Sequence, residues 1–160
     1  MNEEAGVNVG MDMDFNASEE AIDIPFLAEG VYIAKIQSVM YKTDISLLEI
    51  TWVLENNGGT YPGTEFSIDG AKVKQNIWLP KAGDEKEMSA NGKMTKRQSK
   101  LNSLKRFCET LGVSGNTPEE INDAILSGSW GGVTGRITVK VKEDDYGIKE
   151  EVRKVESLDS

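Results

Sequence analysis

Histidine is absent from this chain of 160 residues, and cysteine occurs only once. A single cysteine, Cys108, excludes an internal disulfide, and the lack of histidine removes both the usual catalytic base and the commonest zinc ligand. No apolar run approaches the roughly 18 residues that a membrane-spanning helix needs. These absences predict a cytoplasmic protein that is not an enzyme, binds no metal or other cofactor and has no contact with a membrane.

Basic residues are missing from the first 24 positions, which carry seven acids. Removing those seven from the total of 27 leaves 20 acids against 18 bases, so the net charge of −9 mostly reflects this segment. Between Met88 and Cys108 the pattern reverses, with six basic residues and no acid. A basic segment on a nearly neutral body can bind a polyanion. We predict a disordered acidic arm over residues 1–24 and one domain over residues 25–157.

Alternating apolar and polar residues predict most of the strands. Within positions 46–55, Leu48, Ile50, Trp52 and Leu54 alternate with Glu49, Thr51, Val53 and Glu55, which is typical of a half-buried strand. Weaker patterns predict further strands over 30–40, 71–79, 133–142 and 148–155, and a short one around 66–68. The acidic residues at 143–145 precede a glycine and are interpreted as a hairpin turn rather than a cation site.

Helical spacing begins only after an exposed loop predicted over residues 80–92. Leu101, Leu104, Cys108 and Leu111 are spaced three, four and three apart, which places them on one helical stripe. Thr117 followed by proline and two glutamates predicts the start of a second helix. Five or six strands, with one or two helices inserted before the last hairpin, predict a mainly β chain that forms an OB-like barrel.

The candidate binding residues lie on the outward faces of two predicted strands and in the basic segment. Single-strand binders combine cations that follow the phosphates with flat aromatic side chains on which bases stack. The strand over 71–79 presents lysines, an amide and an indole, and the strand over 133–142 presents three cations. The predicted nucleic-acid-binding residues are Lys72, Lys74, Asn76, Trp78, Lys93, Lys96, Arg97, Lys100, Arg136, Lys140, Lys142 and Tyr146.

Each of these residues also has a purely structural interpretation. Lysines on an outer strand face are commonly only solvated, and cations beside a leucine stripe flank any amphipathic helix. Trp78 is either a stacking platform or a partly buried core residue. Trp52, on the apolar face of its strand, and Trp130, after a helix end, are predicted to pack in the core.

Several segments together resemble a known family. They are Pro25-Phe26-Leu27-Ala28-Glu29-Gly30-Val31-Tyr32, the strand from Leu47 to Trp52 with Tyr61-Pro62-Gly63, the helix from Leu101 to Gly112, and the strand from Gly135 to Val141 with Tyr146-Gly147. This combination is similar to the small phage-encoded OB-type proteins that bind single-stranded DNA in replication and recombination. The resemblance implies a protein that coats single-stranded DNA without strong sequence preference in the cytoplasm of an infected bacterium. It also implies phage or host replication and recombination proteins as further partners.

The position of the acids departs from that family. Many of its members end in an acidic tail that recruits partners, whereas here the acids lie at the start of the chain. We hypothesise that residues 1–24 occupy the DNA groove until DNA displaces them, or that they recruit partners. Two other functions remain open: a β-barrel module that binds a host protein through the acidic arm, which the pI of about 4.6 favours, and a structural virion component.

Overall fold

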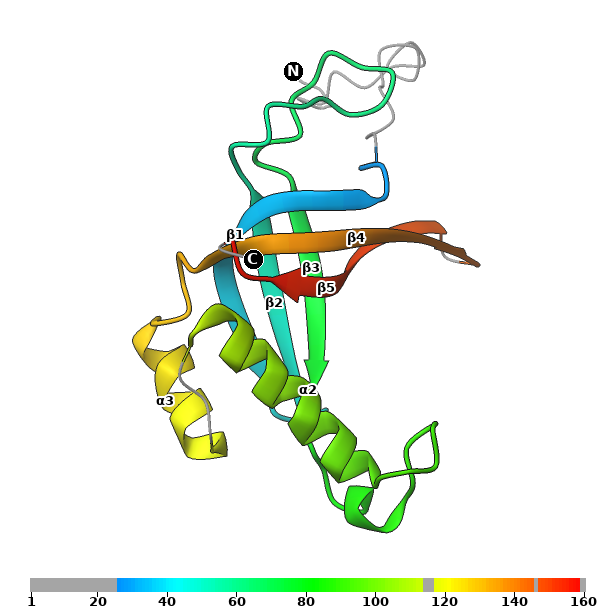
Figure 1. Ribbon diagram of the computed structural model, residues 1–160, viewed down its shortest axis with the longest axis vertical. Coiled ribbons are helices and arrows are strands. Elements are labelled where there is room, and N and C mark those ends of the chain that lie inside the picture. The colour runs from blue at the N-terminus through cyan, green and yellow to red at the C-terminus, as the bar shows by residue number, and fades with distance from the viewer. Residues whose placement is uncertain (1–25, 114–116, 146, 159–160) are drawn as a thin grey trace, which may run out of the picture.

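The computed structural model describes residues 26–113, 117–145 and 147–158, so the predicted acidic arm and Tyr146 lie outside the described residues. Within these ranges the chain forms five strands and two α-helices (Figure 1). The predicted short strand around residues 66–68 is wrong, because only an isolated bridge joins Thr60 to Ser67 there. The elements are β1 (Gly30–Lys42), β2 (Leu47–Leu54), β3 (Lys72–Trp78), a 3₁₀ turn η1 (Asp84–Lys86), α2 (Lys96–Leu111), α3 (Pro118–Ser127), β4 (Thr134–Asp144) and β5 (Gly147–Glu156).

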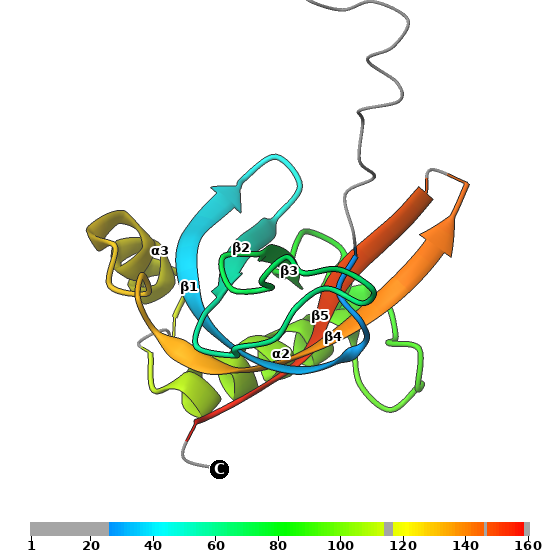
Figure 2. The same cartoon turned by 90° about the horizontal axis from the view of Figure 1, so that it is seen from above.

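The strands form one antiparallel sheet in the order β3-β2-β1-β4-β5. The first half of β1 pairs with β4 and its second half pairs with β2, with a register shift between Ile36 and Ser38. Such irregularities bend a strand, and β1 curves strongly around the sheet (Figure 2). The curvature brings β3 and β5, the two ends of the order, close to each other. The predicted OB-like architecture, with helices before the last hairpin, is therefore confirmed.

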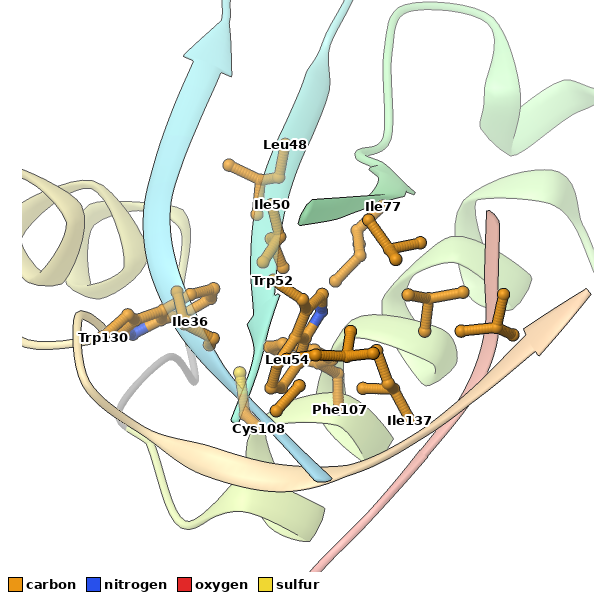
Figure 3. Close-up of a cluster of buried hydrophobic side chains, with 14 of the residues drawn as sticks. Ile36, Leu48, Ile50, Trp52, Leu54, Ile77, Phe107, Cys108, Trp130 and Ile137 are labelled. Carbon is orange, nitrogen blue, oxygen red and sulfur yellow. The ribbon is translucent and has the colours of Figure 1, made fainter. Parts of the chain in front are cut away.

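The core lies between the curved sheet and α2, and its centre is an indole. Trp52 is fully buried and lies between the strands and Phe107 of α2 (Figure 3). The ring of Phe107 lies 5.6 Å from that of Trp130, which is also buried. The predictions that both tryptophans pack in the core are confirmed. Burial raises the pKa of the Cys108 thiol to about 11, as expected for a small core residue rather than a nucleophile.

The ends of the two helices follow from their sequences. Thr95 and Gln98 form a reciprocal capping box at the start of α2, and Gly112 ends that helix in the left-handed conformation that favours glycine. Thr117 accepts a hydrogen bond from the backbone N–H of Glu120 and so caps α3. In the described part of the chain, neither helix is long and apolar enough to span a membrane.

The first described residues are attached to the last hairpin. The backbone N–H of Leu27 donates to the carboxylate of Glu150 on β5. Glu29 accepts a hydrogen bond from the backbone N–H of Val141 on β4 at 2.9 Å. The chain therefore enters the domain beside the β4–β5 hairpin.

Candidate nucleic-acid interface

A groove runs between the outward face of β3 and the β4–β5 hairpin, and we call it the hairpin groove. Along β3 the even positions are exposed and Val73 and Ile77 are buried, as the alternation predicts. The groove encloses about 370 Å³. Its lining residues are Glu49 on β2, Lys74, Gln75, Asn76 and Trp78 on β3, and Lys142, Lys149, Glu151, Val152 and Arg153 on the hairpin.

Trp78, the last residue of β3, lines this groove with a half-exposed indole. Its side chain is 49% exposed, although it pairs across the sheet with Leu47, which is buried. Trp78 also lines a second cleft, between β3 and α2, together with Ser99 and Ser103. A half-exposed indole beside two clefts is suited to stack a flat ligand.

Carboxylates hold several of the groove's cations in place. Lys74 lies 3.4 Å from Glu49, and Lys142 and Arg153 lie 3.0 Å and 3.1 Å from Glu151. Burial raises the pKa of Glu49, but hydrogen bonds from Lys42 and Lys74 outweigh it and lower the pKa overall. The hydrogen bond from Lys142 is the main cause of the lowered pKa of Glu151. The cations of these pairs are more than half exposed, and surface pairs contribute about 0–1 kcal/mol, so exchanging the carboxylate for a phosphate costs each cation little.

A third cleft, which we call the helix trough, lies between α2 and the last residues of β5. It encloses about 580 Å³ and is lined by Ser103, Arg106 and Thr110 from the helix and by Arg153 and Lys154 from the strand. Gln75 lines the helix trough, the hairpin groove and the cleft between β3 and α2. The three clefts therefore meet at one side chain.

Two of the predicted phosphate-binding lysines are in ion pairs with the preceding loop. Lys100 lies 2.7 Å from Asp84, and Lys96 lies 2.7 Å from Glu87. Asp84 is only 2% exposed and also accepts a hydrogen bond from the backbone N–H of Lys81. The loop predicted as exposed is therefore fixed to α2 by a buried carboxylate. Lys100 lines the cleft beside Trp78, but its ammonium group has this structural partner.

We expect Asp84→Asn to lower the midpoint of thermal unfolding at pH 7 by several degrees. The hydrogen bond from Lys100, followed by that from the Lys81 backbone, lowers the pKa of Asp84 in the folded state. Its stabilising contribution is thus complete above the unfolded-state pKa of about 4 and is lost as the pH falls through the lowered pKa. Thermal unfolding of both proteins at pH 7 and near pH 3 should show the difference shrinking in acid. Asp123→Asn, at an exposed position on α3, is the control, and an equal effect at this position would contradict the prediction.

The remaining predicted residues do not line the hairpin groove. Lys72 is exposed on β3, and Lys93 is exposed in the loop before α2. Arg97 lines a separate, mainly apolar pocket with Tyr41. The other two, Arg136 and Lys140, lie on the polar face of β4.

The sequence prediction missed the contribution of the last strand. Lys149, Arg153 and Lys154 are interspersed with glutamates along β5, so they do not form a basic run that would predict a phosphate-binding segment. Their place in the lining of the clefts follows from the position of β5 beside β3, which a barrel with this strand order requires. Gln75 was also missed, because an uncharged side chain on a strand gives no signal in the sequence.

The described residues contain no group of three or more possible metal ligands among His, Cys, Asp and Glu. No protein-family model matches this chain, and no curated protein matches it. The candidate interface is therefore interpreted from its own geometry and charge.

Proposed function

We propose that this chain binds single-stranded DNA without strong sequence preference and coats it during phage replication or recombination. The observation that carries the proposal is the half-exposed indole of Trp78 in the lining of a groove with four cationic side chains. Bases of any sequence stack on an aromatic side chain, and cations bind the phosphates between them. The phage context comes from the family resemblance of the sequence.

The placement of the cations also favours a single strand over a duplex. In the hairpin groove the cations lie on both walls, with Lys74 on β3 facing Lys142 and Lys149 on the hairpin. Such an arrangement surrounds one phosphate backbone, whereas a duplex offers its phosphates on a broad convex surface. Asn76, between Lys74 and Trp78, adds an amide that can donate to or accept from any base edge.

The acidic arm enters the proposal as a competitor for this groove. The backbone of Leu27 is hydrogen-bonded to Glu150, which does not line the groove itself but lies between Lys149 and Glu151, which do. The seven acids of residues 1–24 are therefore joined to the domain at the hairpin that carries three of the groove's cations. Like charges on the arm and on DNA make their binding to those cations mutually exclusive.

The proposal is tested by titrating the full chain into fluorescently labelled oligo-dT and into a duplex of the same length over a range of salt. We expect tight binding to oligo-dT, weak binding to the duplex, and a linear fall of log affinity with log salt. Four cations that each neutralise one phosphate give a slope of about −3. Absence of binding to oligo-dT at low salt would overturn the proposal and leave a protein-interaction module as the best account.

A further inference from the structure

The helix trough, between α2 and the end of β5, has the properties of a second phosphate-binding surface. Three cationic side chains line it, against the single carboxylate of Glu156. Arg106 forms no ion pair with another described residue, and Lys154 has only a loose pair of 3.7 Å with Glu156. Both cations are therefore available to an incoming anion.

Gln75 is oriented so that it can serve a ligand in this region. Its Oε1 accepts a hydrogen bond of 2.8 Å from the indole N–H of Trp52. Because an indole N–H can only donate, the amide must turn its oxygen towards Trp52 and its NH₂ group elsewhere. That NH₂ group belongs to the one residue that lines all three clefts. A buried tryptophan thus fixes a hydrogen-bond donor at their junction.

The three clefts are continuous through shared residues. Trp78 and Asn76 line both the hairpin groove and the cleft between β3 and α2. Ser103 and Phe107 line both that cleft and the helix trough. A nucleic-acid strand with one base stacked on Trp78 can therefore continue along the surface past Gln75 to Arg106 without crossing an exposed apolar face.

We infer that a bound DNA strand continues beyond Trp78, past the amide of Gln75, into the helix trough, where Arg106 and Lys154 bind its phosphates. This inference rests on the proposed function. The lining favours a phosphodiester strand, because hydroxyl groups of Ser103 and Thr110 alternate with cations there. Such groups supply most contacts to phosphate and sugar in protein–DNA complexes. One protein molecule consequently covers more nucleotides than the hairpin groove alone could hold.

Oligonucleotides of two lengths distinguish this inference from the proposed function. The full-length double variant Arg106→Glu/Lys154→Glu is titrated with oligo-dT of about 4 and about 16 nucleotides, lengths at the two ends of what one OB-type domain covers. We expect an unchanged affinity for the short oligonucleotide, which the hairpin groove holds alone. The affinity for the long one should fall about tenfold, because reversed charges repel the phosphates in the trough.

The matched control is Lys86→Glu/Lys105→Glu, which makes the same charge change at exposed positions outside the three clefts. Thermal unfolding of both variants verifies that they are folded. Equal losses for both lengths, or losses equal to those of the control, would overturn the inference but not the proposed function. A higher affinity of Arg106→Glu/Lys154→Glu for oligonucleotides of both lengths would also overturn the inference. It would indicate that the cations of the helix trough bind the acidic residues 1–24 instead of DNA. Failure of the unsubstituted chain to bind either length would overturn both.

Discussion

Replacing Trp78 with alanine is expected to weaken the binding of oligo-dT by roughly 5- to 150-fold. Stacking of one base on an aromatic side chain contributes about 1–3 kcal/mol, and each 1.4 kcal/mol corresponds to a factor of ten in affinity. Trp78 is the one tryptophan of the three that is exposed, since Trp52 and Trp130 are buried. The measurement is a fluorescence titration at low salt, where the cationic contacts keep the weakened complex detectable.

Phe66→Ala provides the matched control for Trp78. Phe66 is 53% exposed, similar to Trp78, but lines none of the three clefts. Its removal should leave the affinity unchanged, and Trp78→Phe should retain part of the stacking. Because Trp78 lies opposite buried Leu47, thermal unfolding must show that the alanine variant is folded. An unaltered affinity of folded Trp78→Ala would contradict the assignment of this indole as a stacking platform.

Trp52→Ala is expected to lower the free energy of unfolding by about 3–5 kcal/mol, out of a total near 5–15 kcal/mol for a domain. Trp52 is fully buried and its side chain fills the space beside Gly135. A methyl group at Gly135 would lie 3.0 Å from the Glu156 carbonyl oxygen and 3.1 Å from Leu111. Strand β4 therefore approaches the core closely at this point, and loss of the indole leaves a cavity that the strand cannot fill. Urea unfolding measures the effect.

Trp52→Phe separates the hydrogen bond from the packing. Phenylalanine keeps most of the apolar volume but has no N–H to donate to Gln75, so we expect a loss of about 1–2 kcal/mol. Leu126→Ala is the control, because Leu126 is 78% exposed and such positions change stability by less than about 0.5 kcal/mol. A Trp52→Ala variant as stable as the Leu126 control would contradict the described core.

The elements that the sequence predicts well are those whose signal is local. The alternation within positions 46–55 corresponds to β2, and the Thr117-Pro118 start and Gly112 stop appear as helix ends. The outward face of β3, with Lys74 and Trp78, follows from the same two-residue period. Local rules suffice here because strand pleat and helix caps depend only on neighbouring residues.

The parts that could not be predicted depend on contacts distant in the sequence. Lys100 was assigned to phosphate, yet Asp84, sixteen residues earlier, takes its ammonium group in the fold. Nothing in a loop rich in glycine and mixed charge distinguishes this buried carboxylate from its exposed neighbours. The approach of β5 to β3, which brings Arg153 to the groove, likewise arises only when the sheet curves.

The two strands that border the hairpin groove are also the two ends of the sheet. An edge strand offers unpaired backbone groups to which another copy can add a strand, and charged side chains are a common protection against such aggregation. Lys72 and Lys74 on β3, and Lys149, Arg153 and Lys154 on β5, place positive charges along both edges. Most of these cations are among those proposed to hold DNA, and the same charges disfavour edge-to-edge pairing of separate copies. Exchange of these residues for glutamate preserves that repulsion between copies, whereas exchange for alanine removes it.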